Sequence, residues 1–438
     1  MINVALPSIM HYFSCTFNQC QWVVVVYLLT ITISLLLWGH LSDRLGKGKI
    51  YLLGMFVFAV GSSGCGFSYS LVQLIFFRFV QAVGAAMMMS TGPAIITHVF
   101  GVQYLGRALG LIGVATSAGL MSGPVVSGFL LHHFGWRAIF FVTIPVSLFV
   151  SVAGYYLVLP TLSLAVISRR IPFDWKSFLC WSLLIIFVVL LSSNHLNLKG
   201  GVVVWYLVGA VVTAVMFITV ERKSNAPLLP HTLLKRKYFT VAMVTAVLSF
   251  SVLFMVIILI PFYLTLVLRL TTIEIGTVMM TLPVTLSIVS PLSGRLYDAI
   301  GAKKLTTSGM LVCAAATFLL SLLATDSGTV DVMWRLAMLG MGQAIFLSPN
   351  SASVLSRVKD KYVGITSGLL ATSRNLGMLF GVAMAGMVFG FFFDYFSGGF
   401  DLNGFQAVHT TAFISSLHFS LLMAATISFV GAMISSLR

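Results

Sequence analysis

A short charged turn between two apolar runs holds a group of ionisable residues near the start of the chain. It extends from Gly39 to Lys49, and within it Asp43 supplies one negative charge beside Arg44 and Lys47. An acid close to the start of a helix is favoured by the helix dipole, and it can pair with a cation from a neighbouring helix. These residue types therefore support a reversible ion pair rather than the making or breaking of bonds.

The same turn occurs a second time, 255 residues later in the chain. Five positions match at this single offset: Gly39, Leu41, Asp43, Gly46 and Lys49 correspond to Gly294, Leu296, Asp298, Gly301 and Lys304. Matches of this kind predict two related halves, each with a charged turn after its second helix. We interpret the turn residues as a conformational latch, the alternative being a merely solvated loop; the latch comprises Gly39, Asp43, Arg44, Gly46, Lys47 and Asp298.

Arg78 lies within a long apolar run, and Gln81 follows it one helical turn later. A charge at the bilayer centre costs about 2.5–3.5 kcal/mol on insertion scales, so such residues usually face the protein interior and serve a function. The alternative is an arginine near a helix end whose head group reaches the membrane surface. Arg374 and Asn375 also interrupt apolar sequence, and two roles fit them equally: contact with an anionic group in a cavity, or hydrogen bonds between helices.

Small residues recur at helical spacing in another apolar run, at Gly119, Gly123 and Gly128 with Pro124 beside the second glycine. Glycines four residues apart give a smooth face for helix contact, and a proline frees a carbonyl and bends the helix. This pattern by itself is typical of close helix packing.

The carboxylates limit what chemistry the chain performs. All ten fall in loops or at the ends of apolar runs, so the sequence shows no buried acid that would carry a proton. Arg335 follows Asp331 by one helical turn, which predicts a local surface pair. No nucleotide-binding glycine loop with a lysine, no metal-ligand cluster and no nucleophile–base arrangement occurs. We therefore expect no enzyme activity, no metal and no cofactor.

The composition places the chain in a membrane. Of 438 residues, 59% are hydrophobic and only 8% are charged, whereas a soluble domain has about 25% charged residues. The net charge of +15 suggests nucleic-acid binding at first sight. Because the basic residues cluster in short loops between apolar runs, membrane topology explains that charge better, and we expect no nucleic-acid partner.

Thirteen apolar runs approach the length of about 20 residues that a helix needs to cross a bilayer. They lie near residues 20–39, 50–69, 72–98, 106–131, 137–158, 175–194, 201–220, 238–264, 272–296, 305–325, 330–355, 363–393 and 411–436. A further run at residues 2–13 is too short, which we interpret as a truncated first span. Loops on one side hold nineteen lysines and arginines and those on the other side hold three, so the first side, with the C-terminus, is expected in the cytoplasm.

These patterns predict an all-α integral membrane bundle of two six-helix halves with two extra central spans. We divide the chain into an N-terminal half at 1–158, two inserted spans at 159–221, a basic cytoplasmic linker at 222–237 and a C-terminal half at 238–438.

Several of these motifs resemble those of the major facilitator superfamily. The turn from Gly39 to Lys47 resembles its signature loop, and Arg78–Gly84 resembles its fourth-span pattern, with Ala82 in place of a glycine. Gly119–Gly128 resembles the fifth-span motif of its antiporters, with Ser127 in place of a glycine, and Arg374–Gly377 resembles a late-span signature of the fourteen-span drug:proton antiporter branch. The family's first span usually opens with an aspartate shortly before a segment like Asn3–Pro7, and no such aspartate precedes it here.

The resemblance implies a proton-coupled multidrug efflux transporter of the cytoplasmic (inner) membrane that works by alternating access. It implies proton or substrate coupling at Arg78 and Gln81, an antiporter hinge at Gly119, Gly123, Pro124 and Gly128, and a cavity that contains Arg374 and Asn375. The expected partners are small amphipathic or apolar substrates, protons and the lipid bilayer, with the chain acting as a monomer. Two alternatives remain open: a specific metabolite or siderophore transporter, and a non-transporting receptor, scaffold or inactive remnant.

Overall fold

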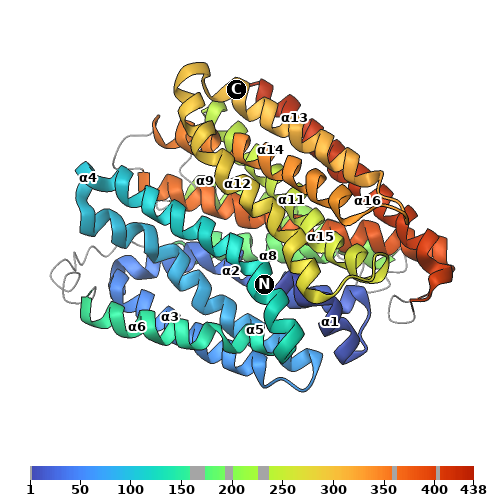
Figure 1. Cartoon of the computed structure of the whole chain (residues 1–438). Coiled ribbons are helices and arrows are strands. Elements are labelled where there is room, and N and C mark those ends of the chain that lie inside the picture. Colours follow the sequence, from blue (N-terminus) through green and yellow to red (C-terminus); the bar gives the residue numbers. More distant parts are fainter. Residues whose placement is uncertain (1, 158–172, 193–200, 225–235, 358–362, 401–404) are drawn as a thin grey trace. The chain divides into compact units, whose positions relative to one another are not determined.

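The computed structural model describes residues 2–157, 173–192, 201–224, 236–357, 363–400 and 405–438. Within these ranges it leaves aside the side chains at 43–44, 93–94, 96–118, 120–121, 157, 192, 201–203, 298, 363–365, 367 and 407. The elements of the described chain are helices (Figure 1): α1 (Ile2–Phe13), α2 (Phe17–Leu45), α3 (Lys47–Gly66), α4 (Leu71–Phe134), α5 (Ala138–Phe141), α6 (Thr143–Leu157), α8 (Trp175–Ser192), α9 (Gly201–Lys223), α11 (Lys237–Leu266), α12 (Thr272–Ile300), α13 (Ala302–Ser321), α14 (Thr329–Leu355), α15 (Val363–Ser397) and α16 (Thr410–Ser436).

Eleven helices in the described part of the chain are long and apolar enough to cross a membrane. A helix satisfies all its backbone hydrogen bonds internally, so apolar runs of this length fold as helices in lipid. Of the thirteen predicted spans, the one at 175–194 appears as a shorter apolar helix, Trp175–Leu191. The one at 106–131 falls largely on residues whose side chains are not described.

Helix α4 differs from the prediction of two spans at 72–98 and 106–131. It is continuous from Leu71 to Phe134, with no connection between the two expected spans. The stretch 99–105 contains no proline, so nothing in it prevents the helical hydrogen bonds from continuing.

The chain forms two compact units. Unit 1 comprises Met1–Gln21, Thr116–Trp136 and Lys235–Arg438, and unit 2 comprises Trp22–Ala115 and Arg137–Leu234. The boundaries fall inside α2 and inside α4, so each of these helices contributes to both units.

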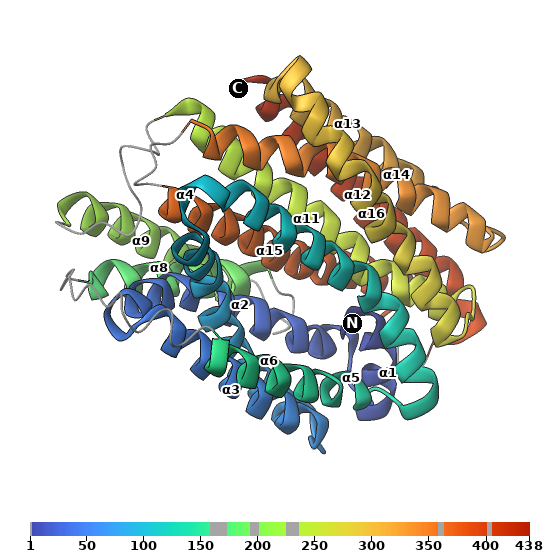
Figure 2. The same ribbon diagram turned by 60° about the vertical axis from the view of Figure 1, so that its left-hand side comes forward.

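In unit 1, α11 runs beside α15, and α13 runs beside α14 and α16 (Figure 2). Met310 and Phe346 are fully buried where α13 meets α14, and Ala432 of α16 packs against them. Helix α1 contacts α11, and the ring of Phe17 lies 4.8 Å from that of Phe262 on α11. The N-terminal segment is therefore part of the core of unit 1.

In unit 2, α3 packs against α5 and α6, and α8 packs against α9. Ile31 of α2 is buried against Ala82, Ala85 and Ala86 of α4, with Tyr27 packed at the edge of this cluster. The small alanine side chains let the two helices approach closely, which brings polar side chains from several helices within hydrogen-bonding distance.

One helix contact occurs in both units. A Cβ atom on Gly84 of α4 would lie 2.5 Å from the carbonyl oxygen of Gly54 on α3, and one on Gly342 of α14 would lie 2.9 Å from that of Gly309 on α13. Gly54 and Gly309 are 255 residues apart, which is the offset of the two charged turns. The same close glycine contact therefore joins α3 to α4 and α13 to α14.

Candidate functional site

Arg78 is buried inside unit 2, with 5% of its surface exposed. Its Nε donates a hydrogen bond to the carbonyl oxygen of Val23 (2.9 Å), and its guanidinium carbon lies 3.9 Å from the centre of the Tyr27 ring. Val23 and Tyr27 are one turn apart on α2, so a single face of that helix offers both the carbonyl and the ring. A charged hydrogen bond and a cation–π contact together compensate part of the cost of burying the cation.

A chain of hydrogen bonds continues from Arg78 to other helices. Its Nη1 donates to Oε1 of Gln81 (2.6 Å), and Nε2 of Gln81 donates to the hydroxyl of Ser62 on α3 (2.6 Å). The Ser62 hydroxyl lies 3.0 Å from that of Thr143, the first residue of α6. Arg78 and Gln81 are thus brought together by a hydrogen bond, and the chain of polar groups joins α2, α3, α4 and α6.

The glycine-rich segment of α4 in unit 1 packs tightly against α12. A Cβ atom on Gly128 would lie 2.6 Å from the carbonyl oxygen of Thr272, and one on Gly276 would lie 2.7 Å from that of Pro124. Neither position has room for a side chain. Gly123 is buried as well, whereas Gly119 is exposed and a Cβ there would meet no atom within 4 Å. Of the four predicted hinge residues, Pro124 and Gly128 form the contact and Gly119 does not.

Arg374 and Asn375 lie on α15 in unit 1, where Asn375 is buried. Nη2 of Arg374 donates to the hydroxyl of Ser351 on α14 (2.7 Å), and its guanidinium carbon lies 5.9 Å from the Phe250 ring on α11. Its Nε is buried without a hydrogen-bond partner. The structure therefore places Arg374 among α11, α14 and α15.

The latch residues are described only in part, because the side chains of Asp43, Arg44 and Asp298 lie outside the described residues. Gly46 separates α2 from α3, with Lys47 as the first residue of α3, and Gly301 separates α12 from α13. Both glycines have positive φ, 96° and 78°, a backbone conformation that residues with a side chain rarely adopt. Gly39 lies on α2 near Ser90, at ordinary contact distance.

The predicted surface pair of Asp331 and Arg335 does not appear among the described contacts. The carboxylate of Asp331 accepts a hydrogen bond from the backbone N–H of Gly328 (3.0 Å) at the start of α14. Nε and Nη1 of Arg335 are buried without a hydrogen-bond partner. The acid caps the helix, since a carboxylate there satisfies an otherwise unpaired N–H.

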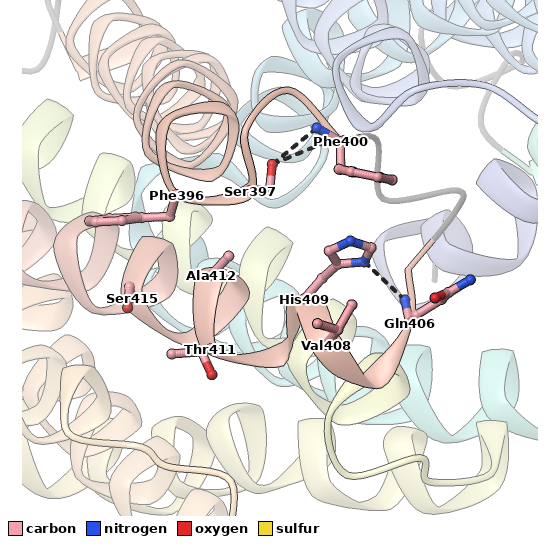
Figure 3. A pocket seen from close by; sticks show the side chains of 9 residues that line it. All are labelled: Phe396, Ser397, Phe400, Gln406, Val408, His409, Thr411, Ala412 and Ser415. Atoms are coloured by element: carbon pink, nitrogen blue, oxygen red, sulfur yellow. Dashed lines mark hydrogen bonds between the residues drawn. The ribbon is translucent and has the colours of Figure 1, made fainter.

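A pocket of about 520 Å³ lies at the connection between α15 and α16 (Figure 3). Phe396 and Phe400 line it near the end of α15, and the backbone N–H of Gln406 donates to Nδ1 of His409 (3.2 Å). None of the site residues predicted from the sequence lines this pocket.

Comparison with known proteins identifies the family. The family model of the Major Facilitator Superfamily matches residues 1–382. The chain belongs to this superfamily. Members of this superfamily are transporters and not enzymes, and their apolar membrane-spanning helices agree with those of this chain. The protein is accordingly a multi-pass membrane protein.

Relatives within the superfamily carry names that refer to different substrates or resistances. The riboflavin transporter RibZ of Clostridioides difficile is 32% identical over 432 residues, which cover 98% of this chain and 91% of that protein. The tetracenomycin C resistance and export protein of Streptomyces glaucescens is 29% identical over 405 residues, covering 89% and 72%. The multidrug resistance protein Stp of Mycobacterium tuberculosis is 28% identical over 398 residues, with the same coverage.

Solved structures share the fold. A peptide transporter, POT, crystallised with alafosfalin, matches with a TM-score of 0.68 at 12% identity and covers 99% of this chain and 91% of that one. A bacterial homologue of the lysosomal transporter Spinster, in an inward-facing and occupied conformation, matches with a TM-score of 0.64 at 16% identity, covering 100% and 92%. This superfamily member therefore has the transporter fold of these proteins.

Proposed function

We propose that this protein is a proton-coupled exporter of small amphipathic or apolar molecules, of the fourteen-span drug:proton antiporter branch, in the inner membrane of a bacterium. It works by alternating access, with two arrangements of the bundle that expose a central site to one side at a time. Names of relatives support export as the direction, since two of them are resistance or multidrug proteins.

The observation that carries the proposal is the buried network around Arg78. A cation within a membrane span is costly, and its neutral partners, a carbonyl, an amide and a ring, leave its charge uncompensated. A shift of α2 against α4 would break hydrogen bonds that involve four helices, so this network responds to a change of conformation of the kind that alternating access requires. Proton coupling is proposed from the resemblance to drug:proton antiporters, because an arginine keeps its proton in proteins.

Riboflavin transport is a second candidate, which the 32% identity to RibZ over nearly the whole chain favours. It corresponds to a transporter of one metabolite instead of an exporter of many. The two candidates differ in the range of solutes that the chain moves, so a direct comparison of solutes separates them.

The test uses everted membrane vesicles that contain the full chain, with an acidic lumen. Ethidium and riboflavin uptake into the lumen is followed with and without a protonophore, beside vesicles that lack the chain. The proposal expects uptake of ethidium or other chemically unrelated solutes that collapses with the protonophore.

Each other result points elsewhere. Uptake of riboflavin alone would support the second candidate. Uptake that persists with the protonophore would contradict proton coupling. No uptake of any solute, with the protein shown to be in the membrane, would overturn both candidates and favour a receptor, scaffold or inactive chain.

A further inference from the structure

Arg374 is a cation whose protein partners are all neutral. A guanidinium has five N–H donors. In the structure one is used by the Ser351 hydroxyl, and the donor on Nε is buried and unpaired. The Phe250 ring is 5.9 Å from the guanidinium carbon, near the outer limit of a cation–π contact. The side chain is only partly buried as a whole, so part of it stays accessible.

Helix packing fixes the direction in which Arg374 reaches. Gly377 and Gly381, one turn apart on α15, lie directly against the backbone of α11 near Val247 and Ser251. A Cβ on Gly377 would lie 2.7 Å from Cβ of Phe250, so the ring is held beside α15. Arg374, one turn before Gly377, then extends between α11 and α14.

A purely structural role does not need a charge at this position. Neutral amides make two hydrogen bonds between α14 and α11. Nδ2 of Asn350 donates to the carbonyl of Ala242 (3.2 Å), and Nε2 of Gln343 donates to the carbonyl of Ser249 (3.0 Å). A neutral amide would hold the Ser351 hydroxyl without the cost of placing a cation in a span.

The acids described in unit 1 lie away from the middle of the spans. Glu274 and Asp331 are in the first turns of their helices, Asp326 precedes α14, and Asp394 is exposed in the last turn of α15. Among these described residues, the electrostatic environment around Arg374 favours a negatively charged ligand.

We propose that Arg374 is a substrate-binding and specificity-determining residue for planar aromatic solutes that carry an anionic or strongly polarised oxygen. The free donors of the guanidinium bind that oxygen, and the Phe250 ring contacts the aromatic part. This proposal rests on the proposed transport function and adds a preference, among its amphipathic substrates, for those with an electron-rich oxygen.

The experiment measures dye binding to the full chain in nanodiscs. Fluorescein, an anion above neutral pH, and rhodamine 123, a cation on the same three-ring skeleton, differ mainly in charge. The variants are Arg374→Gln, which removes the charge, and Arg374→Lys, which keeps the charge without the planar fork of donors. Arg335→Gln is the matched control, because it removes one positive charge from another partly buried arginine of unit 1.

The parent chain is expected to bind fluorescein more tightly than rhodamine 123. Arg374→Gln should weaken fluorescein binding by about 10- to 100-fold, which is what loss of hydrogen bonds to a charged group costs, and leave rhodamine 123 binding within about twofold. Arg374→Lys should give an intermediate affinity, and Arg335→Gln should match the parent.

Three results would overturn the inference: equal loss of both dyes in Arg374→Gln together with a lower melting temperature, the same fluorescein loss in Arg335→Gln, or a parent chain that does not prefer fluorescein. If the vesicles described above transport solutes while the dyes show no charge preference, the inference fails and the transport function stands. If no solute is transported but the dye preference follows Arg374, the binding site stands and the transport function fails.

Discussion

The guanidinium of Arg78 is held by three kinds of partner: a backbone carbonyl, an amide side chain and an aromatic ring. The carbonyl and the ring lie one turn apart on α2 and the amide lies on α4 itself, so the arginine depends on the relative position of α2 and α4 within unit 2. The coupling role that we propose for Arg78 therefore depends on residues that are not themselves charged.

We expect Arg78→Ala to reduce uptake driven by a pH gradient by at least about tenfold and to flatten its dependence on pH. Removing the cation leaves Oε1 of Gln81 without its donor and takes from the Val23 carbonyl the bond that it accepts in addition to its α-helical one, and such losses cost about 1.5–3 kcal/mol for a charged hydrogen bond. Initial rates at several lumenal pH values would check this. Arg295→Ala is the control, since Arg295 is exposed. A variant with the parent pH profile would contradict a coupling role.

At this scale the sequence identified the charged residues and missed their partners. Arg78, Gln81 and Arg374 stand out because polar residues in an apolar run are costly. Tyr27, Ser62 and Thr143 give no such signal, because aromatic and hydroxyl residues are common in membrane helices and their roles arise only when four helices pack together. Helical spacing places Tyr27 on the same face of α2 as Val23, but only the structure shows that this face meets Arg78.

At the scale of the helices, the contact of α4 with α12 leaves no room for a side chain at either of its glycines. Pro124 and Gly128 meet Thr272 and Gly276 with backbone against backbone, so any side chain at the two glycines must push the helices apart. The motif in the sequence predicted close packing or a hinge. It did not reveal which glycine makes the contact, because that depends on how α4 is rotated about its axis.

Gly128→Leu should reduce transport at least about tenfold, because an overpacked contact typically costs 1–3 kcal/mol and favours one separation of the two helices. Gly119→Leu on the same helix should retain transport near the parent rate, since a Cβ there meets no atom within 4 Å. Rates in the everted vesicles, at equal amounts of inserted protein, provide the measurement. Equal losses in both variants would show that the contact with α12 is not what limits cycling.

Across the whole molecule, the offset of 255 residues links two turns and two helix contacts. Gly46 and Gly301 both adopt positive φ, and in the α3–α4 and α13–α14 contacts Gly54 and Gly309 obey the same offset, whereas their partners Gly84 and Gly342 are 258 residues apart. The sequence revealed the repeat in the turns because charged and glycine residues are rare against an apolar background. It did not predict the continuous α4 or the distribution of α2 and α4 over both units, since these depend on long-range packing.

Replacing Gly46 or Gly301 by alanine should lower the free energy of unfolding by about 1–3 kcal/mol each, because both combine a positive φ with an extended ψ, a conformation that is strained for a residue with a Cβ. The double variant should lose the sum, because the two turns lie in different units. Denaturant unfolding in detergent micelles measures these losses. Gly39→Ala, inside α2 and free of close contacts, is the control and should not destabilise. Full stability of Gly46→Ala would contradict a backbone requirement.

Unit 1 combines the N-terminal segment with helices from the C-terminal part of the chain, which has a consequence for biosynthesis. Phe17 packs against Phe262 and Phe389, yet it leaves the ribosome long before either of them. At about 5–20 residues per second, the N-terminal segment waits roughly 20–70 seconds for Phe389 to be synthesised. During that interval its core-facing residues need a temporary partner, either lipid or the insertion machinery. Biogenesis of this transporter is therefore completed in two late steps, because a ribosome stalled before α11 would release a chain in which Phe17 lacks both aromatic partners, and one stalled before α15 would release a chain in which it lacks Phe389 alone.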